Sequence, residues 1–211
     1  MILRFISYMK SDYNRRTLIF SLISMIICFA FAIFNGVLGI IKQSIWCGSI
    51  CIYYLLLLSI KMLLLLNRNK KGNEIGLTIV SYSILLIITL AMITPAILMI
   101  RNERTYSFGL IPAISSAAYT TYSFTLAIIN LTKASKSDNL IVRQLRLINM
   151  ITALMSIIVL QNTLISANGG YDESMKLLTT YTSFLIIGIA VILIVIYLIK
   201  TLKKKNDPIE E

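Results

Sequence analysis

Six apolar stretches, each longer than about 20 residues, constrain the fold of this chain more than any other feature of its sequence. A helix needs roughly 20 apolar residues to cross the hydrocarbon core of a bilayer, which is about 30 Å thick. The predicted spans are 17–41, 44–66, 75–100, 107–131, 145–167 and 176–199. Hydrophobic residues make up 57% of the 211 residues, against about 45–50% in ordinary soluble domains. We therefore predict one all-α domain, a bundle of six transmembrane helices embedded in the lipid bilayer.

The first two spans are joined by a very short turn within the stretch 35–61, NGVLGIIKQSIWCGSICIYYLLLLSIK. Helices joined by so few residues lie antiparallel and side by side. The helices that return after each turn start with similar residues: ICIYY at 50–54, AYTTYSF at 118–124 and TTYTSF at 179–184. Internal repeats are frequent in transporter folds. The similarity favours three antiparallel hairpins built on one plan.

Lysine and arginine residues are distributed unevenly between the two sides of this arrangement. Sixteen of the 20 basic residues flank the spans on the side that holds both chain ends, and four lie on the other side. Because basic residues gather in cytoplasmic loops, both termini are predicted to be cytoplasmic. The same rule accounts for the net charge of +11, so no nucleic-acid partner is expected.

Two charged segments flank the membrane domain. Residues 1–16 are amphipathic and predict an interfacial helix before the first span. Residues 17–199 form the six-helix transmembrane domain, and residues 200–211 form a charged cytoplasmic tail. The expected location is the cell membrane, with several passes. Frequent Ile, Asn and Lys residues point to an AT-rich bacterial genome.

Several residues within the spans carry predictions of their own. Lys61 lies five residues from the inner end of the second span, where a lysine is expected to extend its ammonium group to the interface. The alternative for Lys61 is a buried functional charge. Gly36 and Gly39 predict a close approach of neighbouring helices. Pro95 is expected to kink the third span and free a carbonyl near Ala91 or Met92.

The residues needed for most enzyme chemistry are missing from the spans. The chain has no histidine, and its nine acidic residues all fall in loops, span ends or tails. General acid–base catalysis and proton relays through the membrane commonly use such groups. The three cysteines, Cys28, Cys47 and Cys51, are interpreted as packing residues. We therefore expect no enzyme activity, no catalytic residue, no metal site and no cofactor.

Uncharged polar residues gather in the outer halves of the predicted spans. Donors and acceptors of this kind beside tyrosine rings suit a small uncharged or amphipathic molecule. The predicted substrate-binding residues are Asn35, Tyr53, Tyr119, Thr120, Gln161, Asn162, Thr180 and Tyr181. The alternative interpretation is that these side chains only join helices by hydrogen bonds. The adjacent carboxamides of Gln161 and Asn162 point in different directions, so one neighbour cannot satisfy both, and for this pair binding and helix packing are supported equally.

The function expected from this pattern is membrane transport or substrate capture through a polar pocket in the outer half of the membrane. In layout alone, the chain resembles the small substrate-binding subunits of energy-coupling-factor vitamin transporters and six-span permeases of ABC-type exporters. Either resemblance implies other membrane or ATPase subunits as partners, since this chain has no nucleotide-binding motif. The alternative is a non-transporting scaffold or immunity-type partner protein.

Overall fold

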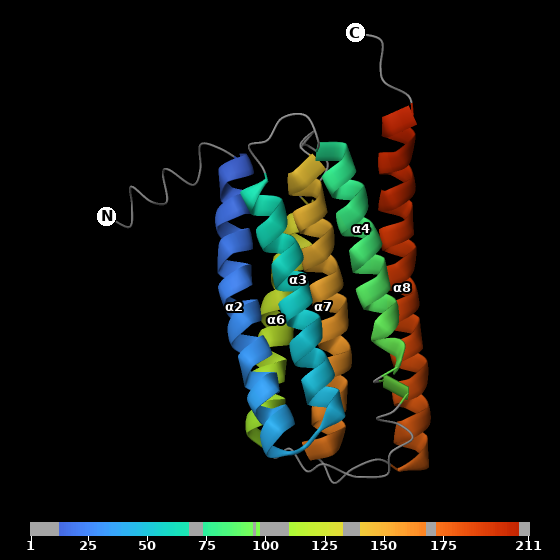
Figure 1. The fold of residues 1–211 in the computed structure, drawn as a ribbon. Helices are drawn as coiled ribbons and strands as arrows, with labels where there is room; N and C mark the ends of the chain where they lie inside the picture. The colour runs from blue at the N-terminus through green and yellow to red at the C-terminus, as the bar shows by residue number, and fades with distance from the viewer. Residues whose placement is uncertain are drawn as a thin grey trace, which may run out of the picture.

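The computed structural model describes residues 13–67, 74–94, 96–97, 110–132, 140–167 and 172–206. Six long helices account for most of this part of the chain (Figure 1). They are α2 (Tyr13–Ile41), α3 (Ile45–Leu66), α4 (Glu74–Ala91), α6 (Leu110–Thr132), α7 (Leu140–Ala167) and α8 (Glu173–Asn206). No strand occurs among the described residues, so the predicted all-α class is confirmed.

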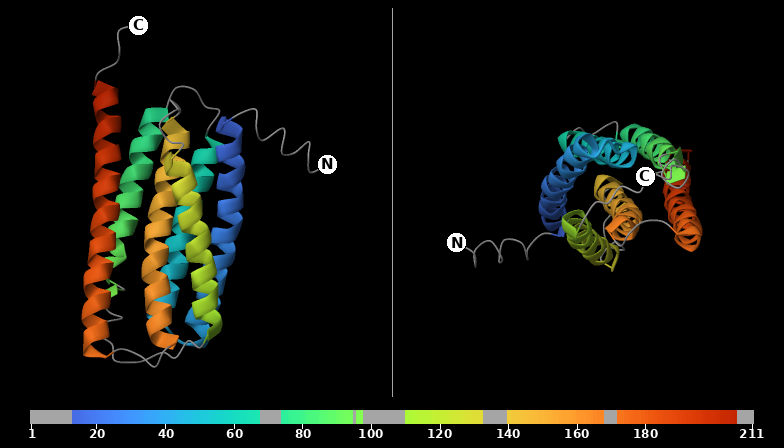
Figure 2. Two further views of the ribbon diagram at one scale, coloured as in Figure 1. Left: turned by 180° about the vertical axis from the view of Figure 1, so that it is seen from behind. Right: turned by 90° about the horizontal axis from the view of Figure 1, so that it is seen from below.

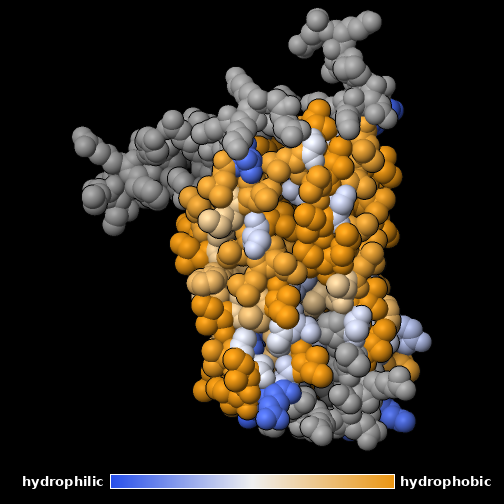
Figure 3. Space-filling view, in the orientation of Figure 1, coloured by the Kyte–Doolittle hydropathy of each residue, from blue (hydrophilic) through white to orange (hydrophobic). Residues whose placement is uncertain are grey.

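The outside of the bundle is apolar over most of its height. On the face shown in Figure 3 most of the surface is hydrophobic, and the most hydrophilic of the described residues lie near the two ends. Large aliphatic side chains are strongly exposed, including Ile40 at 81% and Ile111 at 74%. Four of the helices, α2, α3, α7 and α8, are long and apolar enough to cross a membrane. A surface of this kind is compatible with a membrane-embedded protein, because soluble monomeric proteins rarely expose so large a continuous apolar area to water.

Helix α7 forms the centre of the bundle, and the other five helices surround it (Figure 2). It contacts each of α2, α3, α4, α6 and α8. In its most apolar stretch 67% of the residues are buried, compared with 28% to 39% in α2, α3 and α8. Polar side chains on α7, such as Gln144 and Asn149, therefore lie inside the protein, where each needs a hydrogen-bond partner.

The helices pair in part as the three predicted hairpins require, and the third hairpin is confirmed, because α7 packs against α8. The first hairpin is confirmed, because α2 and α3 pack along each other. The second is wrong: α4 and α6 share no substantial contact within the described residues, and α4 packs against α8 instead, while α6 packs against α7. The absence of the second hairpin follows from the central position of α7. Helix α6 packs against α7 on one side of the bundle, and α4 packs against α8 on another side.

The turn between α2 and α3 is defined by backbone hydrogen bonds. The amide of Ser44 donates to the carbonyl of Gly39 over 3.0 Å, and the amide of Gln43 donates to Ile40 over 3.3 Å. This is the Schellman pattern, in which the residue after the helix adopts a left-handed conformation; Gln43 does so with φ of 49°. The side chain of Ser44 then accepts a hydrogen bond from the amide of Cys47 and caps α3.

Glycines allow α2 and α3 to approach closely, as predicted. A methyl group added at Gly39 would lie 3.0 Å from the backbone nitrogen of Gly48. One added at Gly36 would lie 3.0 Å from the sulfur of Cys51. Gly39 thus both accepts a hydrogen bond of the turn and lets the backbones of α2 and α3 meet beside it.

The observed ends of two helices differ from the predicted boundaries. Helix α4 ends at Ala91, whose carbonyl would need an amide hydrogen from Pro95 that proline lacks. Helix α8 continues to Asn206, so seven of the twelve residues of the predicted tail 200–211 are helical. Most of the predicted interfacial segment 1–16 lies outside the described residues.

The terminal end of the bundle is where α2 begins at Tyr13 and α8 ends at Asn206, and the hairpin end holds the turn between α2 and α3 (Figure 1).

Candidate functional site

Lys61 is fully buried where α2, α3 and α7 meet, with none of its surface exposed. Its ammonium nitrogen donates a hydrogen bond to the hydroxyl of Ser24 over 3.2 Å. Ser24 donates in turn to the side-chain oxygen of Asn149 over 3.4 Å. The expectation that Lys61 extends to the interface is wrong, because the side chain points inward to α2 and α7. The position of Lys61 agrees with the alternative prediction, that of a buried ionisable side chain.

An aromatic cluster lies nearer the hairpin end in the same core. Phe31 of α2 stacks on Tyr119 of α6, with ring centroids 4.0 Å apart and planes 5° from parallel. Tyr54 of α3 packs edge-on against both of them. The thiol of Cys28, one turn before Phe31, contacts the carbonyl of Tyr54 over 3.8 Å. The rings fill the space between α2, α3 and α6.

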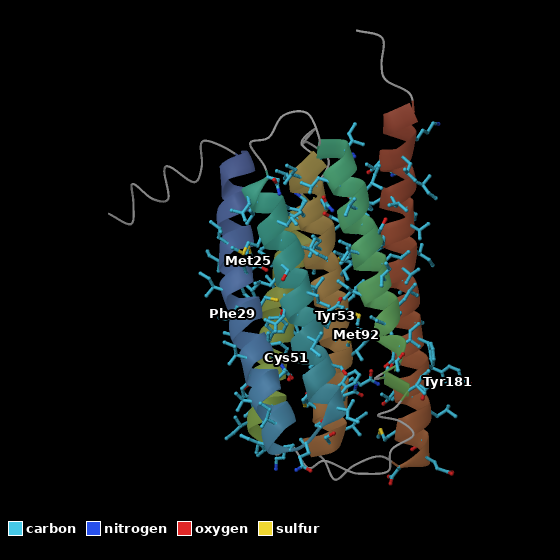
Figure 4. The ribbon with its side chains drawn as sticks, viewed as in Figure 1. Met25, Phe29, Cys51, Tyr53, Met92 and Tyr181 are labelled. Atoms are coloured by element: carbon cyan, nitrogen blue, oxygen red, sulfur yellow. The ribbon has the colours of Figure 1, made fainter. Side chains whose placement is uncertain are left out.

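A groove of about 310 Å³ opens between α3 and α4 in the hairpin half of the bundle. Tyr53 and Met92 lie close together between these two helices (Figure 4). The groove is lined by Ser49, Ile52, Tyr53, Leu56, Ile87, Ile88, Ala91 and Met92. The Tyr53 hydroxyl is buried near Thr89 and makes no hydrogen bond of ordinary geometry within the described residues. The groove is therefore apolar, with two hydroxyl-bearing residues along one wall.

Four of the predicted binding residues lie on α2, α3 and α6, and all four are buried. The amide of Asn35 donates to the carbonyl of Phe31 one turn earlier, over 2.8 Å. Tyr119 is held in the aromatic cluster. Thr120 donates to the carbonyl of Ser156 on α7 over 3.0 Å. Tyr53 is the member of the predicted set that lines the groove.

The other four predicted residues lie on α7 and α8. Gln161 accepts a hydrogen bond from Thr182 over 2.7 Å and so joins the two helices. The neighbouring Asn162 is 2% exposed, so the two carboxamides do lie in different environments. Thr180 is half-buried, and Tyr181 is 67% exposed and points away from the bundle (Figure 4). Within the described residues the eight side chains do not line one common chamber, and their role in binding stays a prediction.

Sequence reasoning missed several residues that the structure brings to these sites. Ser24 accepts a hydrogen bond from Lys61 and donates one to Asn149, and Met92 lines the groove together with Tyr53. The position of Lys61 inside a span is the signal that could have led to Ser24 and Asn149, because an intramembrane charge commonly has a polar partner on another helix. No comparable signal marks Met92, because an apolar residue in an apolar span carries no positional information.

Comparison of the chain with protein-family models, with curated proteins and with solved structures finds no match.

Proposed function

We propose that this chain is a multi-pass protein of the bacterial cell membrane that captures or transports a small amphipathic molecule, and that it is not an enzyme. The groove between α3 and α4 is the proposed binding site. In this proposal all six helices cross the bilayer, the terminal end faces the cytoplasm, and the groove lies in the outer half of the membrane. Other membrane or ATPase subunits would supply any energy for transport.

The observation that carries this proposal is the chemistry of the groove. Its volume of about 310 Å³ lies at the lower end of the range for small-molecule sites, which begins near 300 Å³. Ile52, Leu56 and Ile87 at its rim are exposed, so a ligand could enter sideways from lipid. Ser49, which is half-buried, provides a polar group that would orient a mostly apolar ligand, and the ring of Tyr53 forms part of the wall.

The charge distribution supports the proposed orientation. In the described part of the chain, basic residues of α2, α7 and α8 cluster at the terminal end, including Arg15, Arg143 and Lys203. Lys42 lies in the turn at the hairpin end. The experiment is to replace Lys42 by cysteine and label intact cells with a membrane-impermeant maleimide. Labelling from outside is expected, and labelling only after lysis would reverse the orientation.

Ligand binding is tested by thermal unfolding of the purified protein in detergent with a panel of amphipathic compounds. A compound that raises the melting temperature should lose its effect in Ala91→Phe, which fills the groove. The matched control is Ala118→Phe, because Ala118 is an exposed alanine on α6 and does not line the groove. Equal shifts in both variants, or no shift with any compound, would count against capture at this site.

A second candidate function is a membrane partner or scaffold protein. It is favoured by the way polar side chains join neighbouring helices, as Thr120 and Gln161 do with α7 and α8. Such hydrogen bonds are the usual means of helix association in membranes. Purification of the tagged chain with one stoichiometric membrane protein, together with no ligand-induced shift in melting, would support this function.

A further inference from the structure

A second pocket, of about 170 Å³, lies in the terminal half of the bundle between α6, α7 and α8. It opens where α6 and α8 flank α7 without substantial contact between them among the described residues. Arg143 and Arg146 of α7 and Tyr197 of α8 contribute its polar wall. No acidic residue lines it in the described part of the chain.

The two arginines share one face of α7, because residues three apart on a helix are neighbours. Arg146 is 6% exposed, and its guanidinium nitrogens are buried, whereas Arg143 is half-buried. Arg143 and Arg146 follow the first residue of α7, Leu140, by three and six positions. At about 1.5 Å per residue they lie roughly 4.5 and 9 Å into the bundle, which is the depth of a bilayer interface rather than of its centre.

The remaining wall becomes apolar with depth. Leu147 and Met150 follow the arginines along α7, and Leu193 lies one turn below Tyr197 on α8. The pocket therefore has positive charge at its rim near the terminal end and apolar side chains deeper in the bundle, and it opens to the side between α6 and α8. This is the polarity of a phospholipid, with a charged headgroup above an acyl chain.

We propose that this pocket binds an anionic phospholipid of the cytoplasmic leaflet, with the lipid phosphate against the half-buried Arg143, the positive charge of the buried Arg146 behind it, and an acyl chain against Leu147, Met150 and Leu193. Guanidinium groups match phosphate oxygens in charge and geometry. Basic pockets between helices on the cytoplasmic side are suited to such headgroups. This inference depends on the proposed membrane insertion and orientation but not on the groove between α3 and α4.

The test measures lipid binding to the full chain in neutral detergent micelles, by native mass spectrometry and by thermal unfolding. Phosphatidylglycerol is expected to bind and to raise the melting temperature, and phosphatidylcholine with the same acyl chains is expected to have at least tenfold lower affinity. Inorganic phosphate at millimolar concentration should produce no shift. A shift with phosphate alone equal to that with phosphatidylglycerol would overturn the lipid as the source of the phosphate.

Variants locate the site. The double variant Arg143→Gln/Arg146→Gln should weaken phosphatidylglycerol binding at least tenfold. Its control is Lys200→Gln/Lys203→Gln, which removes the same charge from exposed positions of α8 at the same end. If the arginine variant fails to fold, Met150→Trp fills the pocket while keeping both arginines, and the same loss is expected. Unchanged binding in Met150→Trp, or an equal loss in the lysine control, would refute the proposed site.

Discussion

The ammonium nitrogen of Lys61 lies 3.2 Å from the hydroxyl oxygen of Ser24, and Ser24 donates its own hydrogen to Asn149. One chain of hydrogen bonds therefore ties α3 to α2 and α2 to the central helix α7. The three side chains are 0%, 7% and 4% exposed. Among the described residues the hydrogen-bond partner of Lys61 is the neutral Ser24, so within this part of the chain the network holds an ionisable group without an opposite charge.

The first prediction concerns this network. Ser24→Ala should lower the free energy of unfolding by about 1–3 kcal/mol, because it leaves Lys61 and Asn149 without a shared partner. Lys61→Met should be neutral or stabilising, because an apolar side chain of similar length needs no solvation in the core. Unfolding by denaturant in detergent micelles measures both.

The double variant Ser24→Ala/Lys61→Met distinguishes a network from two separate effects. Its cost should be smaller than that of Ser24→Ala alone, since the lysine that lost its partner is no longer there. A coupling energy of about 0.5–3 kcal/mol is typical of residues in direct contact. Additive costs would show that the hydrogen bond between Lys61 and Ser24 does not contribute.

The second prediction concerns the stacked rings of Phe31 and Tyr119. Tyr119→Phe should keep the melting temperature nearly unchanged, because the ring and its stacking survive. Tyr119→Leu and Phe31→Leu should each destabilise, and a double-mutant cycle should give a coupling of about 0.5–1.5 kcal/mol. The control is Phe29→Leu on the same helix, where the ring is 47% exposed and points outward (Figure 4). A loss as large in Phe29→Leu would mean that the stack is not the cause.

The third prediction separates two glycines of the first hairpin. Gly39→Ala should destabilise by about 1–3 kcal/mol, because the new methyl group would press on the backbone of Gly48 and force the helices apart. Gly48→Ala should be neutral or stabilising by up to about 1 kcal/mol, because a methyl group there meets nothing within 4 Å and alanine favours the helix. Thermal unfolding of both variants checks this, and similar melting temperatures would contradict it.

The fourth prediction concerns the turn residue Gln43. Its φ of 49° lies in the left-handed region, which costs a residue with a Cβ about 1–2 kcal/mol. The expected order of stability is Gln43→Gly above the natural protein, and Gln43→Val well below it, because a β-branched side chain fits this region worst. A variant Gln43→Val as stable as the natural chain would show that the turn rearranges at little cost.

The helices were largely predictable because apolar length is a local property of the sequence. The predicted span 44–66 agrees with α3 to one residue, and α7 begins five residues before the predicted start of its span at 145. The third span was predicted to reach residue 100; α4 ends at Ala91, helical residues follow at 93–94 and 96–97, and residues 98–100 lie outside the described part of the chain. The interruption of the helix after Ala91 agrees with the predicted effect of Pro95 on the carbonyl of Ala91.

The sites were less predictable, because every polar residue in an apolar span looks alike in the sequence. Thr120 and Gln161 were selected for binding, and the structure shows them bonded to neighbouring helices. Tyr181 was selected from the same reasoning and lies on the outside of α8. Which side of a helix faces lipid and which faces α7 depends on its rotation in the bundle, and hydropathy that is high all round a helix does not encode that rotation.

By itself the sequence determined that this chain forms long apolar helices, that two of them form a tight hairpin, and which bundle end carries most of the positive charge. These properties follow from residue type and spacing within one helix or turn. Only the tertiary structure decided that α7 lies in the centre, that α4 pairs with α8, and that Lys61 is enclosed rather than directed to the surface. Contacts between distant segments decide these features, and in helices that are apolar on every side many such packings are consistent with one sequence pattern.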